Sequence, residues 1–166
     1  MPRLLTRSAA PPQRLRVGLF GGSFNPPHVG HRHASLIALR RLELDAVWWL
    51  VTPGNPLKDA RDLAPLSQRL KAAVDIENHP RIHVTTLESE LGTRFTADTL
   101  ATLSQRFPAI NFVWIMGADN LATIHKWRDW QTIFRTMLIV VVARPGYPMK
   151  ALSSPAARRF AASRVD

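Results

Sequence analysis

The chain contains no cysteine, which excludes a disulfide framework and any metal site built on thiolates. This composition fits a reducing compartment. No apolar run reaches the roughly 18 residues that a membrane-spanning helix needs, and the start, MPRLLTRSAAPPQR, lacks the apolar core of a secretory signal. We therefore expect a cytoplasmic protein without a membrane partner.

Several motifs of nucleotide and zinc chemistry are also missing. The chain has no GxxxxGK[ST] sequence, no GxGxxG sequence and no HExxH sequence. A P-loop, a dinucleotide fingerprint and a zinc-protease helix are therefore excluded. Internal repeats and low-complexity segments are absent as well, and the length of 166 residues suits one domain with a real core.

Positive charge is abundant, with a formal net charge of +10. Most of the excess lies in residues 1–16 and 144–166, so the segment 17–143 is nearly neutral. Basic ends supply mainly non-specific attraction to nucleic acid, and we do not expect a nucleic-acid partner.

Strand-like and helix-like segments alternate along the chain. Apolar segments of strand length occupy 16–20, 46–52, 81–88, 110–116 and 137–143. Helical patterns occupy 28–42, 67–78 with Ser67 as N-cap, 96–107 and part of 118–125, whereas 53–65 has the composition of a loop. Such alternation predicts an α/β fold with a doubly wound, Rossmann-like parallel sheet of five strands in the order 3-2-1-4-5.

That strand order makes strands 1 and 4 neighbours. Ligands of doubly wound sheets bind at the carboxyl ends of the strands, where the strand order reverses. The loops expected there are GGSFNPPHVGH (21–31) and GADN (117–120), so we expect them to lie side by side.

The first of these loops suits phosphate. Gly21 and Gly22 allow close backbone approach, and His28 and His31 lie one turn apart near a helix N-terminus, which attracts anions. From the residues alone, the two histidines could equally be a capping pair or two ligands of a metal. A zinc site would need a third ligand, and no motif supplies one.

GGSFNPPHVGH resembles the GxFxPxHxGH signature of the HIGH-type nucleotidyltransferase superfamily, and the chain is most similar to its bacterial nicotinate-nucleotide adenylyltransferase family. Further similarity lies in TPGNPLK, SQRLKAA, FTADTL, WIMGADNL, HKW and ARPG, in the family's order, over residues 16–146. The resemblance implies transfer of AMP from ATP to nicotinate mononucleotide, which gives deamido-NAD and pyrophosphate in NAD biosynthesis. It also implies Mg²⁺ bridging the phosphates, with no protein ligand assigned to the metal. Its partners would be these small molecules; the sequence leaves the oligomeric state open.

The resemblance also implies roles for matching residues. His28 and His31 would be catalytic and contact the ATP phosphates. The other expected ATP-binding residues are Gly21, Gly22, Ser23, Phe24, Gly30, Gly117 and Asp119. The expected mononucleotide-binding residues are Asn25, Lys58, Thr96, Trp127 and Arg144. Helix capping or surface pairing explains Asp98 and Arg69 nearly as well as a role in the site.

Two features depart from the family pattern. Asn25 stands where the best-known motif has Asp, and we expect its side chain to shape the loop. LSSPAARR (152–159) resembles the family's C-terminal ISSTxIR-like motif only superficially, so we expect that motif to lie beyond residue 166.

The expected organisation is a disordered tail over 1–15, a nucleotidyltransferase domain over 16–146 and the start of a C-terminal region over 147–166. Two alternatives to this function remain. The first is a related enzyme that uses pantetheine phosphate or nicotinamide mononucleotide as the acceptor, or that transfers a cytidylyl group. The second is a non-catalytic nucleotide-binding domain.

Overall fold

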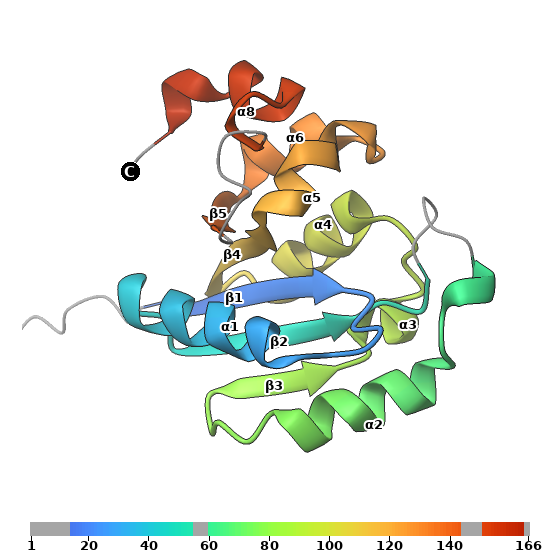
Figure 1. Cartoon of the computed structure of the whole chain (residues 1–166). Helices are drawn as coiled ribbons and strands as arrows, with labels where there is room; N and C mark the ends of the chain where they lie inside the picture. The colour runs from blue at the N-terminus through green and yellow to red at the C-terminus, as the bar shows by residue number, and fades with distance from the viewer. Residues whose placement is uncertain (1–13, 55–59, 144–150, 165–166) are drawn as a thin grey trace, which may run out of the picture.

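A computed structural model describes residues 14–54, 60–143 and 151–164 (Figure 1). Its centre is a parallel sheet of five strands in the order β3-β2-β1-β4-β5. The strands are β1 (Leu15–Gly22), β2 (Ala46–Val51), β3 (Ile82–Thr85), β4 (Ile110–Gly117) and β5 (Leu138–Val142). The predicted fold class and strand order are therefore confirmed.

Helices cover both faces of this sheet (Figure 1). The α-helices are α1 (Val29–Arg41), α2 (Leu66–Ile76), α3 (Leu87–Leu91), α4 (Thr96–Arg106), α5 (Ala118–Thr123), α6 (Trp130–Thr136) and α8 (Pro155–Arg159). The 3-10 turns are η1 (Ala60–Asp62), η2 (Ile124–Lys126) and η3 (Ala161–Ser163). Helices α1 and α2 contribute to one buried cluster, and α4, α5, α6 and α8 contribute to the other.

The strands are apolar on both faces because each face packs on helices. Along β4, Trp114 and Met116 belong to the cluster beneath α4, whereas Val113 and Ile115 belong to the cluster beneath α1. Strand β1 runs two residues further than predicted, and Gly21 and Gly22 pair with the end of β2. The sheet therefore carries the glycines directly to its carboxyl edge.

Two local predictions are wrong. The segment expected to be strand over 81–88 leaves the sheet after Thr85, because Leu87 begins α3 and packs with Leu91 against the core. Gly92 then ends α3 with a left-handed φ of 68°, a conformation that glycine adopts without strain. Ser67 is not the N-cap of α2, since that helix begins one residue earlier, after Pro65.

The C-terminal part of the described chain packs on α5 and η2 through α8. LSSPAARR contains α8 and its N-cap: the Ser154 hydroxyl accepts a hydrogen bond from Ala157 N at 3.2 Å, and Pro155 occupies the first turn. No helix of the described residues has both the length and the apolar composition that crossing a membrane requires.

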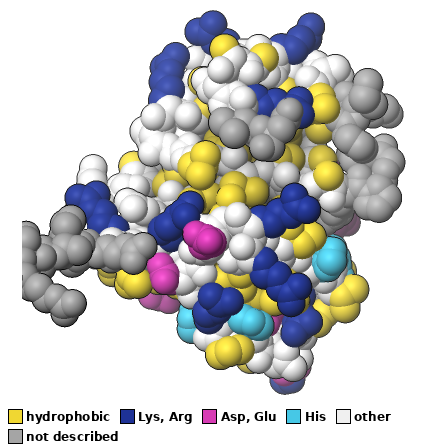
Figure 2. All heavy atoms as spheres, turned by 90° about the vertical axis from the view of Figure 1, so that its left-hand side faces the viewer, with side chains coloured by type: hydrophobic (Ala, Val, Ile, Leu, Met, Phe, Trp, Pro, Cys, Tyr) yellow, Lys and Arg dark blue, Asp and Glu magenta, His cyan; other side chains and the backbone are white. Residues whose placement is uncertain are grey.

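Figure 2 shows the face of the molecule at the amino ends of the strands. Lys and Arg side chains there are interspersed with hydrophobic, acidic and histidine side chains. Helices α1 and α4 end in this direction with Arg40, Arg41 and Arg106. The face lies opposite the carboxyl edge of the sheet, where the pocket opens.

Candidate active site

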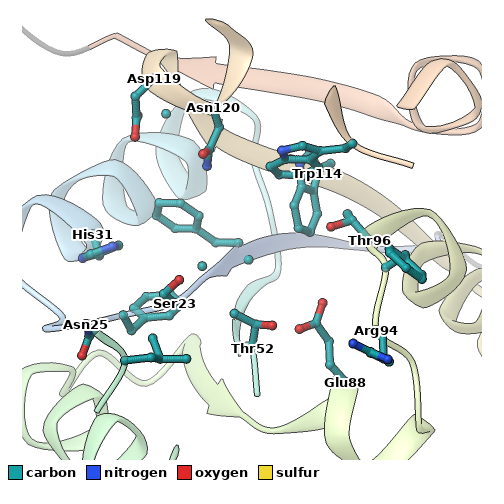
Figure 3. Close-up of a pocket in the computed structure, with 18 of the residues that line it drawn as sticks. Ser23, Asn25, His31, Thr52, Glu88, Arg94, Thr96, Trp114, Asp119 and Asn120 are labelled. Carbon is teal, nitrogen blue, oxygen red and sulfur yellow. The ribbon is translucent and has the colours of Figure 1, made fainter. Parts of the chain in front are cut away.

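A pocket of about 780 Å³ lies at the carboxyl edge of the sheet, a volume typical of small-molecule sites. Both loops expected there line it: 20–26 with His28 and His31 on one side, and Gly117 with Asp119 and Asn120 on another. Figure 3 shows Ser23, His31, Asp119 and Asn120 around one cavity, with Thr52 and Glu88 below and Arg94 and Thr96 beside them. The two most unusual loops of the sequence thus meet at one site.

His28 and His31 form a reciprocal cap at the start of α1. His28 Nδ1 accepts a hydrogen bond from Gly30 N at 3.1 Å, and His31 Nδ1 accepts one from His28 N at 3.2 Å. Because both Nδ1 atoms accept, each neutral ring carries its proton on Nε2. The cap therefore fixes the tautomer that donates hydrogen bonds outward, and the capping and phosphate-binding interpretations are compatible.

Buried aromatic rings pack around His31. The Phe24 ring lies 4.6 Å from the His31 ring and 5.0 Å from the Trp49 ring, measured between centroids. Trp49 Nε1 donates to Ser35 Oγ at 2.8 Å, and Ser35 Oγ donates to the carbonyl of His31 at 2.9 Å. Since Phe24 is almost fully buried, its side chain positions His31, and its expected ATP contact stays a prediction.

Gly21 makes room for a tryptophan. A Cβ at Gly21 would overlap the six-membered ring of Trp114, which is buried at the floor of the pocket. Trp114 Nε1 has no hydrogen-bond partner within the described residues. Glycine is therefore required at position 21 by this packing, and close approach of a ligand to Gly21 stays a prediction.

In the GADN loop, too, a glycine lies close to a side chain of the pocket. Gly117 is the N-cap of α5, and a Cβ there would overlap Asp119 Oδ1. That oxygen is buried and has no hydrogen-bond partner in the part of the chain that the structure describes. An acceptor in this position at the pocket wall suits a ligand hydroxyl or amine.

Arg69 lies beneath the loops with only 2% of its surface exposed. Its guanidinium donates to the carbonyls of Ala64 at 2.7 Å, Ser23 at 2.7 Å, Thr52 at 2.8 Å and Pro53 at 3.3 Å. Surface pairing, one of the two alternatives considered for Arg69, is therefore wrong. The side chain instead joins the segments that end β1 and β2.

The Asn25 side chain also forms hydrogen bonds with backbone groups. Its Nδ2 donates to the carbonyl of Asp62 at 2.8 Å, and its Oδ1 accepts from Ala64 N at 3.2 Å. An aspartate could supply only the acceptor. These contacts agree with a loop-shaping role for Asn25, while its expected contact with the mononucleotide stays a prediction.

The opposite end of the pocket contains the start of α4. Thr96 is its first residue, and the N-cap Phe95 offers no side-chain hydrogen bond to the first turn. Trp127 lines the pocket nearby, and the Arg128 guanidinium lies 4.7 Å from the centroid of the Phe95 ring. An uncapped helix start beside an aromatic face suits a planar anion.

Lys58 and Arg144, two expected phosphate ligands, lie outside the described residues. Within those residues, no three His, Cys, Asp or Glu side chains form a cluster that could hold a metal ion.

Sequence patterns missed several charged residues of the pocket, among them Arg94 and Glu88. Arg94 directly precedes FTADTL, so extending that match by one residue could have found it. Nothing in LESEL indicates a buried carboxyl, yet Glu88 is only 7% exposed. Burial raises the pKa of Glu88, and the neighbouring hydroxyls of Thr52 and Thr99 oppose that change.

The sequence matches a family described as cytidylyltransferase-like over residues 19–160. It is 58% identical over 149 residues to a protein of Cereibacter sphaeroides named "Probable nicotinate-nucleotide adenylyltransferase", covering 90% of this chain and 80% of that one. Proteins with the same name from Ruegeria pomeroyi and Brucella abortus are 55% and 53% identical. These alignments cover 90% and 92% of this chain, and 70% and 78% of the relatives.

Solved structures share the fold. Nicotinic acid mononucleotide adenylyltransferase of Plasmodium falciparum, complexed with NaAD, superposes with a TM-score of 0.64 at 19% identity. The match covers 88% of this chain and 83% of that one.

Proposed function

The chain belongs to the cytidylyltransferase-like family and, within it, to the nicotinate-nucleotide adenylyltransferases; from this premise we propose that it transfers AMP from ATP to nicotinate mononucleotide. The products are deamido-NAD and pyrophosphate, and the reaction belongs to NAD biosynthesis. The observation that carries this conclusion is the 58% identity over 149 residues to a relative of that name. The pocket agrees with it, because one end offers donors for phosphates and the other offers a helix start beside an aromatic ring.

The reaction is a direct displacement. A phosphate oxygen of the mononucleotide attacks the α-phosphorus of ATP, and the bond to the pyrophosphate oxygen breaks. No group of the protein needs to form a covalent bond, so the site acts by positioning the reactants and stabilising charge. We assign the ATP phosphates to the loop from Gly21 to Ser23 and to Nε2 of His28 and His31. These donors stabilise negative charge on the phosphates in the transition state.

The remaining ATP contacts follow from the second loop. Gly117 and Asp119 border the pocket beside α1, and we assign them to the adenosine moiety. A ribose hydroxyl would satisfy Asp119 Oδ1, which has no partner in the described part of the chain.

Enzymes of this class generally use a divalent metal, and we propose Mg²⁺. The described residues hold no cluster of three metal ligands, and we propose that the ion enters with the ATP phosphates. When bound, it offsets the charge of the leaving pyrophosphate.

We assign the nicotinate ring to the end of the pocket formed by Thr96 and Trp127. The ring would stack on the Trp127 indole, and its carboxylate would accept hydrogen bonds from the uncapped first turn of α4. Lys58 and Arg144 are proposed as phosphate ligands from their place in the sequence alone. Residues 16–146 are proposed as the domain that carries the reaction.

Release of pyrophosphate tests this assignment. The protein, ATP and Mg²⁺ should release pyrophosphate with nicotinate mononucleotide and much more slowly with nicotinamide mononucleotide or phosphopantetheine. Chromatography should show deamido-NAD in amounts equal to the pyrophosphate. Faster turnover with either alternative acceptor would overturn the substrate. Binding of ATP without turnover of any acceptor would favour a non-catalytic nucleotide-binding domain.

A further inference from the structure

Glu88 is a charged residue of the pocket that the reaction, as described above, does not use. It lies on α3, beneath the cavity, between Thr52 at the end of β2 and Thr96 at the start of α4 (Figure 3). The carboxyl group points up into the cavity in this view. Its residue is only 7% exposed, so a ligand that fills the pocket would contact this carboxyl without bulk water between them.

The contacts of Glu88 leave it with hydrogen-bonding capacity. Thr99 Oγ1 lies 3.4 Å from Oε1, a long hydrogen bond, whereas the neighbouring Thr52 hydroxyl donates its proton to the carbonyl of Gly54 at 2.8 Å. No Lys or Arg of residues 14–54, 60–143 and 151–164 forms a salt bridge with it. Burying a carboxyl without a cation costs free energy, and such groups often mark functional sites.

The chemistry of the proposed substrate limits what this carboxyl can bind. Phosphate and ring carboxylate, the two ends of nicotinate mononucleotide, are anions that a carboxylate repels. The ribose between them offers hydroxyl groups, and carboxylates are strong acceptors for these hydroxyls. Since Glu88 lies between Thr52, which follows β2, and the proposed ring-binding end at Thr96 (Figure 3), its position corresponds to the middle of the mononucleotide.

The geometry points to Glu88 as the residue that binds the ribose hydroxyls of the mononucleotide and thereby selects a ribonucleotide acceptor. This inference rests on the proposed function, because it assumes that nicotinate mononucleotide occupies this half of the pocket. A purely structural role, in which Glu88 only ties α3 to α4 through Thr99, is the alternative that an experiment must separate.

Two ligands and two variants make that separation. Wild-type protein is titrated with nicotinate mononucleotide and with its 2′-deoxy and 3′-deoxy forms, and binding is followed by quenching of tryptophan fluorescence. At least one deoxy form should bind about tenfold or more weakly, as expected for loss of a hydrogen bond to a charged group. Glu88→Met, which keeps the length of the side chain without its oxygens, should bind all three ligands with similar affinity.

Glu90→Met is the matched control, since Glu90 is exposed on the same helix and lies outside this pocket. It should discriminate against the deoxy forms as wild type does. If Glu88→Met does not fold, Glu88→Gln replaces it, and reduced discrimination is expected.

The outcomes distinguish the two proposals. Wild-type protein that binds the ribose and both deoxy forms equally overturns the role of Glu88 without any variant, and so does a folded Glu88→Met that keeps full discrimination. In both cases the proposed function stands. Wild-type protein that binds no nicotinate mononucleotide would overturn the proposed function, and the ribose contact with it.

Discussion

Arg69 Nη1 lies 2.7 Å from the carbonyl oxygen of Ser23 and donates a hydrogen bond to it. The same nitrogen lies 2.8 Å from the carbonyl of Thr52. Ser23 follows β1 on the side proposed for ATP, and Thr52 follows β2 on the side proposed for the mononucleotide. One buried guanidinium therefore joins the two segments that we propose to bind the substrates.

Replacing Arg69 should impair turnover more than substrate binding. Arg69→Met leaves four carbonyls without their donor, and an unsatisfied buried group costs roughly 1–3 kcal/mol. We expect lower stability in urea denaturation. At a temperature where the variant is folded, kcat should fall at least tenfold with a smaller change in KM, because the loops lose their relative placement. Arg69→Lys should recover part of the activity.

Arg81→Met is the control for this variant. Arg81 Nη1 also donates to a backbone carbonyl, that of Leu44 at 3.2 Å, but it lies at the opposite edge of the sheet. Some stability should be lost without a change in kcat. Equal effects of both variants on kcat would contradict a positioning role for Arg69.

Gly21 and Trp114 should be energetically coupled. Gly21→Ala places a methyl group against the Trp114 ring, and overpacking of this kind costs about 1–3 kcal/mol. Trp114→Phe removes the outer ring, so the double variant should be more stable than the sum of the single effects predicts. Urea denaturation of the four proteins measures this coupling as a double-mutant cycle. Additive effects would mean that another contact requires glycine at position 21.

The fold could be predicted because its signals are local. Apolar runs of strand length, separated by helical patterns, are enough to indicate a parallel sheet, and the breakers in 21–31 mark its ligand edge. The predicted strand over 81–88 is wrong beyond Thr85. The strand-like pattern of the sequence has no break there, but the chain leaves the sheet. Only packing of Leu87 and Leu91 against the core decides that boundary.

The site could be predicted only in part, because only some of its contacts join residues that are close in the sequence. His28 and His31 belong to a continuous motif, so their proximity follows from helical spacing. The burial of Arg69 and Glu88 follows from contacts between segments far apart in the sequence, such as the 46 positions between Arg69 and Ser23. No pattern around Arg69 or Glu88 distinguishes it from an exposed charge.

The stability of the protein should depend on pH through Glu88. Burial raises the pKa of this carboxyl above its ordinary value of 4.5. Its contribution to stability is therefore fully present below about pH 4.5 and is lost as the pH rises through the folded-state pKa. Each pH unit that separates the folded-state pKa from the unfolded-state pKa corresponds to about 1.4 kcal/mol. Glu88→Gln cannot ionise, so its Tm relative to wild type should increase from pH 4 to pH 7.

Glu90→Gln, measured in parallel, accounts for the general effect of removing a carboxyl from α3. The difference between the two variants isolates the buried group. A Tm difference for Glu88→Gln that stays constant across this range would contradict burial of an ionisable carboxyl at this position.

His28 should serve the helix with one ring nitrogen and the substrate with the other. Nδ1 accepts the hydrogen bond from Gly30 N, and Asn places its amide oxygen in the same position along the side chain. His28→Asn should therefore keep the cap of α1 and change stability by less than about 0.5 kcal/mol, whereas His28→Ala should cost about 0.5–2 kcal/mol. Both variants lose Nε2, so both should lower kcat by roughly 10²–10³-fold, the usual cost of removing one donor to a charged transition state. Urea denaturation and pyrophosphate release measure the two effects separately. Turnover retained by His28→Asn would show that the cap, and not the imidazole, is what the reaction requires.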